Sequence, residues 1–157
     1  MNLLAVNLFL AVGWAALVGS FTATSLAVGY FIGFGCLWVA RPLFGDDAYF
    51  KRVYRALRLI VLFIYELVVS SFRVAWDVIT PSHLSSPGIV AMPLDAKTDT
   101  EVYLTASLIT LTPGTLSLDV SPDRKTLYVH GMFIDDPETL KTEMKQGLER
   151  AVLQALE

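Results

Sequence analysis

A run without any charged side chain, residues 3–40, constrains this fold more than any other feature of the chain. A hydrophobic helix needs about 20 residues to cross a bilayer core of about 30 Å. Gly19-Ser20 divides the run into two apolar stretches, 2–18 and 21–40. A single unbroken helix of about 38 residues would be too long for one crossing. The sequence therefore predicts a transmembrane helical hairpin over residues 1–40.

A cleaved signal peptide is the alternative interpretation of the first stretch. That stretch has no basic residue at its start, no small-residue cleavage pattern follows it, and a second apolar stretch comes directly after it. These features favour a membrane helix over a signal peptide.

Two glycines of the second stretch, Gly29 and Gly33, are separated by three residues. Small residues at this spacing lie on one side of a helix and allow a second helix to approach closely. The spacing predicts a helix-packing contact, although glycine is also common in membrane helices for other reasons.

Composition agrees with a membrane protein. Of the 157 residues, 54% are hydrophobic and only 17% are charged, which is more apolar than a small soluble domain. The net charge of −3 argues against a nucleic-acid partner. Cys36 is the only cysteine, which excludes an intrachain disulfide and a thiolate metal site.

Basic residues gather directly after the second apolar stretch, whereas the N-terminus and the Gly19-Ser20 turn have none. The positive-inside rule therefore predicts a cytoplasmic loop over residues 41–54 and a cytoplasmic N-terminus. The same residues are suited to contact anionic lipid headgroups. The cluster consists of Arg41, Lys51, Arg52, Arg55 and Arg58.

Residues 55–80 form a third apolar segment, which carries one polar stripe. The stripe residues are three, eight, four, three and four positions apart, which is helical spacing. The segment is either an amphipathic helix at the cytoplasmic interface or a third transmembrane helix. Its longest uncharged piece, 59–65, is only seven residues, which favours the interface. The stripe consists of Arg55, Arg58, Glu66, Ser70, Arg73 and Asp77.

Glu66 is the one residue of the chain that suggests ion chemistry. A carboxylate within an apolar helix can take up a proton near neutral pH, because desolvation favours its neutral form. Glu66 is therefore a candidate proton relay. The alternative, which we favour, is a charge on the helix surface that pairs with Arg73 or with a neighbouring subunit.

The chain after Pro81 reads as a soluble domain, 89–157, which follows a linker at 81–88. The order strand, helix, strand, strand, helix (βαββα) predicts a small α+β domain with helices on one face of a mostly antiparallel sheet. Its core of about 70 residues is marginal, so we expect it to dock on the membrane part or on a partner. The predicted elements are 89–94, 100–111, 115–120, 126–134 and 137–157.

This soluble half contains no pattern typical of an enzyme. Neither His83 nor His130 has acidic or cysteine neighbours at a metal-binding spacing, and no serine lies in a Gly-x-Ser-x-Gly turn. Asp135 and Asp136 precede Pro137 and are more typical of a helix start than of a catalytic pair. We therefore predict no catalytic, cofactor or metal site.

Four segments carry a family resemblance. They are 72–81 (FRVAWDVITP), 87–90 (PGIV), 107–120 (SLITLTPGTLSLDV) and 127–130 (LYVH). These segments closely resemble the E subunit of Mrp-type (Mnh/Pha) multisubunit monovalent cation/proton antiporters. The resemblance covers the whole chain in length and layout. It implies a bacterial inner-membrane complex that exchanges sodium or potassium for protons, with the C-terminal domain in the cytoplasm.

Within such a complex, the resemblance implies an accessory, non-catalytic subunit that assembly and full antiport need. Other membrane subunits of the complex would then be its partners. The alternative is a membrane-anchored binding or regulatory module without a role in ion transport.

Overall fold

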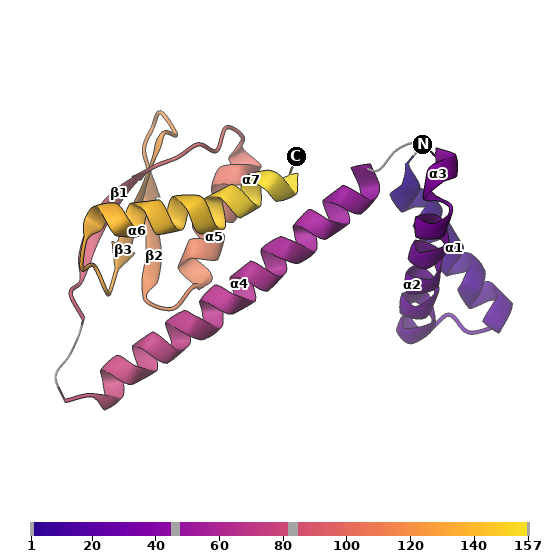
Figure 1. The fold of residues 1–157 in the computed structure, drawn as a ribbon, viewed down its shortest axis with the longest axis horizontal. Coiled ribbons are helices and arrows are strands. Elements are labelled where there is room, and N and C mark those ends of the chain that lie inside the picture. The colour runs from indigo at the N-terminus through magenta and orange to yellow at the C-terminus, as the bar shows by residue number, and fades with distance from the viewer. Residues whose placement is uncertain (1, 45–47, 82–84, 157) are drawn as a thin grey trace. The chain divides into compact units, whose positions relative to one another are not determined.

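The computed structural model describes residues 2–44, 48–81 and 85–156, and its contacts divide the chain into two compact units. Unit 1, Met1–Val53, contains helices α1 (Leu3–Val18), α2 (Ala23–Val39) and α3 (Arg41–Phe44) and the start of α4 (Ala48–Ile79). Unit 2, Tyr54–Glu157, contains the rest of α4 and a small α/β domain (Figure 1).

Helices α1 and α2 form a hairpin because the residues between them stop one helix and start the next. Gly19 has a φ of +69°, a left-handed conformation that glycine adopts without strain, and its N–H donates to the carbonyls of Ala15 and Ala16. The side chain of Thr22 then accepts a hydrogen bond from the Ser25 N–H (3.2 Å) and caps α2.

Helix α4 begins at Ala48, which corrects the predicted loop over 41–54. The structure shows helix at α3 and again from Ala48, and the predicted helix started at 55. Aromatic packing explains the earlier start, since the ring of Phe34 on α2 lies 5.8 Å from that of Tyr49 and 5.4 Å from that of Phe50. The helix ends at Ile79, two residues before Pro81.

Among the described residues, α4 is the one helix that is both long and apolar enough to cross a membrane. Helices α1 and α2, of 16 and 17 residues, are apolar but shorter. Many of their large apolar side chains are nevertheless exposed, among them Phe9, Leu17, Phe31 and Val39.

Unit 2 contains a three-stranded antiparallel sheet in the order β1-β3-β2. The strands are β1 (Gly88–Pro93), β2 (Thr115–Val120) and β3 (Thr126–Gly131). Strand β3 ends three residues before the predicted Ile134, and a bulge between Ser117 and Asp119 interrupts the pairing of β2 with β3. The prediction of a small antiparallel sheet with helices is confirmed.

One face of the sheet builds the core. Val90 pairs with Val129 and Met92 with Leu127, so these four side chains share a face and are buried. Helices pack on that face with three buried side chains and with Leu62 and Phe63 of α4, whereas Ile89 and Tyr128 on the opposite face are exposed. The buried helical side chains are Ile109, Met144 and Leu148.

Helix α5 (Asp99–Leu111) starts with a capping box. The Thr98 hydroxyl accepts from the Glu101 N–H, and the Glu101 carboxylate accepts from the N–H groups of Lys97 and Thr98. The chain leaves the helix at Thr112, and Gly114 has a φ of +90°. The observed bounds of α5 agree with the predicted 100–111 to within one residue.

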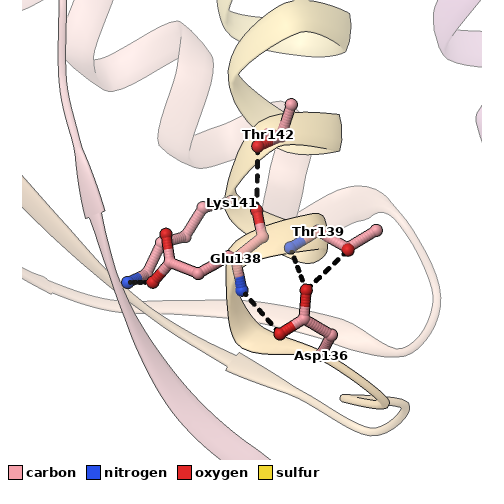
Figure 2. A network of polar contacts seen from close by, with 5 residues as sticks. All are labelled: Asp136, Glu138, Thr139, Lys141 and Thr142. Carbon is pink, nitrogen blue, oxygen red and sulfur yellow. Dashed lines mark hydrogen bonds and ion pairs between the residues drawn. The ribbon is translucent and has the colours of Figure 1, made fainter.

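The C-terminal helix, predicted as one element over 137–157, consists of three: α6 (Pro137–Met144), the π-helical segment η1 (Lys145–Glu149) and α7 (Arg150–Leu156). Asp136 starts α6 (Figure 2), because its carboxylate accepts from the Thr139 N–H (2.9 Å) and hydroxyl (2.6 Å) and from the Glu138 N–H (3.4 Å). These hydrogen bonds, with that of the Thr139 hydroxyl the strongest, lower the pKa of the Asp136 carboxyl.

Candidate functional site

A cavity of about 460 Å³ opens in unit 2 between α4 and the α/β domain. Its polar lining comes from Glu66, Ser70 and Arg73 on α4, Thr112 after α5 and Glu143 on α6. Its remaining wall is mostly apolar. The structure thus brings Glu66 and Arg73, the two candidate ion-chemistry residues, to one cavity.

Arg73 has partners other than Glu66. Its Nη2 lies 3.4 Å from Oδ2 of Asp135, and its guanidinium carbon lies 4.9 Å from the centre of the Phe133 ring. Both partners belong to the segment between β3 and α6. Arg73 therefore fastens α4 to the α/β domain by a charge pair and a cation–π contact.

Glu66 is half-buried and forms no ion pair within the part of the chain that the structure describes. Glu66 and Glu143 both line the cavity, as does Arg73. The charged residues of the lining are thus two acidic and one basic.

The two sides of α4 meet different surroundings. Arg58 on the polar stripe donates to the Gln154 side chain of α7 (2.8 Å), and Leu62 and Phe63 pack against the core of the α/β domain. Arg73 makes the contacts given above. The opposite side exposes an apolar surface, which we call the α4 outer face. It consists of Leu57, Val61, Ile64, Val68 and Phe72, which are 47% to 73% exposed.

The predicted lipid-facing basic cluster is distributed over two helices. Arg41 is the first residue of α3, whereas Lys51, Arg52 and Arg55 lie near the start of α4. Lys51 and Arg52 are exposed. The guanidinium of Arg58 donates a hydrogen bond to the Gln154 side chain within the protein.

Gly29 and Gly33 are buried on α2 where it meets α1. A Cβ atom on Gly29 would lie 2.8 Å from the Ala11 carbonyl oxygen and from Trp14 Cβ. A Cβ atom on Gly33 would overlap the side-chain oxygen of Asn7. By contrast, a Cβ atom on Gly35 would meet nothing within 4 Å. A side chain at Gly29 would therefore require a shift of the backbone, and one at Gly33 would require the Asn7 side chain to move.

A polar cluster inside unit 1 was missed by sequence reasoning. Asn7 is fully buried, and its Nδ2 donates to the Tyr49 hydroxyl (2.9 Å), which lies 3.1 Å from the Tyr30 hydroxyl. Asn7 Oδ1 has no hydrogen-bond partner in the described structure. The available signal was a single amide side chain in the middle of an otherwise apolar run.

Glu149 is a second residue that sequence reasoning missed. It is 1% exposed, and its Oε1 accepts from the N–H groups of Asp95 (2.6 Å) and Ala96 (3.1 Å). The widened turn of η1 lets both Leu148 and Glu149 point inward, which a regular helical period does not predict.

The remaining candidates do not form a site. His130 lies half-buried on β3, and His83 lies outside the described residues. Among the described residues, no group of three or more His, Cys, Asp or Glu side chains is placed to hold a metal ion.

Comparisons with known proteins assign the family. Residues 7–155 match the family model MNHE, described as Na+/H+ ion antiporter subunit. The chain is 40% identical over 148 residues to the Na(+)/H(+) antiporter E subunit of Alkalihalophilus pseudofirmus, covering 94% of each chain. It is 35% identical over 146 residues to the corresponding E subunit of Bacillus subtilis, covering 93% of this chain and 92% of that one.

Two solved structures are similar to this one. A chain of the Mrp complex from Dietzia sp. DQ12-45-1b is 32% identical, with a TM-score of 0.52 over 66% of this chain and 96% of that one. A chain of the archaeal membrane-bound sulfane sulfur reductase matches with a TM-score of 0.57 at 23% identity over 95% of this chain and 98% of that one, which shows a shared fold. The resemblance found in the sequence is therefore confirmed, and the chain belongs to the family of Na+/H+ antiporter E subunits.

Proposed function

We propose that this chain is an accessory, non-catalytic subunit of a multisubunit Na+(K+)/H+ antiporter in a bacterial inner membrane. The observation that carries the proposal is the match of nearly the whole chain to antiporter E subunits. The match also covers 92% to 94% of the length of these relatives. The exposed apolar side chains of α1, α2 and α4 further support a protein that lies among lipids and other membrane subunits.

The hairpin of α1 and α2 is the part that crosses the membrane in this proposal. Helices of 16 and 17 residues measure about 24–26 Å, slightly less than the bilayer core, and a small mismatch is tolerated. The N-terminus and the basic cluster then lie on the cytoplasmic side.

Helix α4 lies along the membrane surface in this proposal, although its length and composition would allow it to span. From Arg58 to Arg73, about 22 Å of helix, the α/β domain packs against its polar side. A spanning α4 would carry that polar domain into the hydrocarbon core, where unpaired polar groups are very costly. With the α4 outer face in the lipid interface, the α/β domain remains in the cytoplasm.

The test is purification of the complex through a tag on the C-terminus of this chain. We expect the tag to co-purify other membrane subunits of an antiporter, and deletion of the gene to abolish antiport or assembly of the complex. The tag should also be protected from protease in intact cells, since the proposal places it in the cytoplasm. Normal antiport and normal assembly without this chain would refute the proposal and favour a separate binding or regulatory module.

A further inference from the structure

The buried carboxyl group of Glu149 has a role that the accessory function does not require. Glu149 is the last residue of the π-helical segment η1 and is 1% exposed, beside the buried side chains of Leu148, Ala151 and Val152. Ionisable side chains are rarely buried this completely without a full set of partners.

The two carboxyl oxygens of Glu149 have unequal surroundings. Oε1 accepts from two backbone N–H groups, those of Asp95 and Ala96, in the turn between β1 and α5. Oε2 is buried and has no hydrogen-bond partner in the described structure. Burying a carboxyl oxygen without a hydrogen-bond partner costs far more free energy when the carboxyl group is charged than when it is neutral.

The charged neighbours do not compensate for this burial. The Asp95 carboxylate disfavours a negative charge on Glu149. The Lys145 ammonium favours that charge, but it already binds the Asp95 carboxylate (2.9 Å) and the Pro93 carbonyl (3.4 Å). Burial is the largest effect on Glu149, and the two N–H groups oppose it only in part, so the pKa of its carboxyl is raised. Helix α5 also packs on η1 and α7, and the charges that act on the carboxyl are those of Asp95 and Lys145.

We propose that Glu149 is a proton-binding site of the α/β domain, and that loss of its proton loosens the contact between η1 and the β1–α5 turn. The neutral carboxyl keeps Oε1 as the acceptor of both N–H groups. When the proton leaves to solvent, the charge on the group requires water at Oε2, and water can reach it only if the contact opens. The carboxyl lies at the end of a π-helical segment, a rare form of helix that is frequently found at functional sites.

The sign of the pH dependence follows from the raised pKa. A carboxyl that binds its proton more tightly in the folded state stabilises the fold at low pH, and this stabilisation is lost as pH rises through the folded-state pKa. The ordinary pKa of a glutamate is 4.5, so the loss begins above that value. The domain should therefore open locally toward alkaline pH.

Hydrogen exchange of the full-length chain in detergent micelles tests the proposal between pH 5 and pH 8. After correction for the intrinsic exchange rate, protection of residues 145–152 and of Asp95 and Ala96 should fall about fivefold or more as pH rises. Glu149→Gln, a neutral mimic of the protonated side chain, should abolish this dependence. Glu143→Gln, an exposed position on the same C-terminal helix, should retain it.

Two outcomes of the exchange experiment overturn the proposal: no pH dependence in the native chain, or the native dependence unchanged in Glu149→Gln. If Glu149→Gln does not fold, carboxyl carbon NMR of the native chain decides. The glutamate carboxyl signal that is absent from Glu149→Asp should titrate above 4.5. Titration of that signal at or below 4.5 overturns the proposal. The result does not depend on whether the chain serves an antiporter.

Discussion

At the scale of single residues, the polar cluster in the hairpin is the most consequential feature of unit 1. Asn7 and Tyr30 come from the two hairpin helices, and Tyr49 from the start of α4, so their hydrogen bonds join three helices. In an apolar environment a polar side chain that loses its partner has no water to replace it. The cluster therefore ties the first turn of α4, which belongs to unit 1, to the hairpin.

Removing the Tyr49 hydroxyl should destabilise the hairpin. Tyr49→Phe leaves the buried Asn7 amide without any side-chain partner, because Asn7 Oδ1 already has none. We expect a loss of about 1 kcal/mol, seen as a lower thermal unfolding midpoint of the protein in nanodiscs. Tyr54→Phe is the control, because Tyr54 lies on the same helix and is 69% exposed. Equal effects of the two substitutions would show that the cluster does not stabilise the hairpin.

The missed residues show what a sequence can and cannot provide at this scale. Asn7 could have been singled out, since one amide in an apolar run must find a partner. Glu149 could not, because its burial depends on the π turn of η1 and on the position of the β1–α5 turn, which is distant in sequence. Arg73 was predicted to pair with Glu66, but the partner that the structure shows is Asp135, which lies 62 residues away in the sequence.

At the scale of secondary-structure elements, local signals predicted the α/β domain well. Thr98 with Glu101, Pro113-Gly114 and the turn at 121–125 each end or begin an element close to its predicted limit. The start of α4 was missed because it depends on Tyr49 and Phe50 packing against Phe34, a tertiary contact without a local signal. Elements limited by capping residues are thus predictable, whereas those limited by packing are not.

Close packing of α1 against α2 makes a specific prediction for the glycines of α2. Gly29→Ala should push the helices apart, because the new Cβ would lie 2.8 Å from the backbone carbonyl oxygen of Ala11 and from Trp14 Cβ. Overpacking of this kind costs about 1–3 kcal/mol, measurable as a lower unfolding midpoint in nanodiscs. Gly35→Ala is the matched control, since open space surrounds that position, and alanine should be neutral or slightly stabilising there. A harmless Gly29→Ala would contradict the packing role.

The proposed orientation of α4 along the membrane surface predicts that all residues of its outer face lie at the same depth in the membrane. Spin labels on cysteines that replace Leu57, Ile64 and Phe72, in a Cys36→Ser background, should all report the same shallow depth in membranes. A spanning helix would instead carry the label at 64 deep into the bilayer and leave 57 and 72 nearer its two surfaces. A label at Ser70, which lines the cavity, should be shielded from lipid and serves as the control.

At the scale of the whole molecule, the two units divide the work of an accessory subunit. Unit 1 contains an apolar hairpin, whereas unit 2 packs the polar side of α4 against its own α/β domain and leaves the α4 outer face exposed. With α4 in the orientation that we propose, this arrangement changes the interpretation of Glu66. The residue lines a cavity beside the α/β domain, so the apolar helix around it would not place it in a proton path through the membrane.

Antiport measured against pH in everted membrane vesicles should therefore be insensitive to Glu66→Gln. The substitution removes the charge and keeps the shape of the side chain, so a proton relay would show a shifted or flattened pH profile. We expect the native profile and a native amount of assembled complex. Arg73→Ala is the contrasting variant, because it removes the contacts with Asp135 and Phe133 that fasten α4 to the α/β domain. It should lower the amount of complex and leave the shape of the profile unchanged. If Glu66→Gln alone changed the pH profile of antiport while the amount of complex stayed normal, the result would support Glu66 as a proton relay.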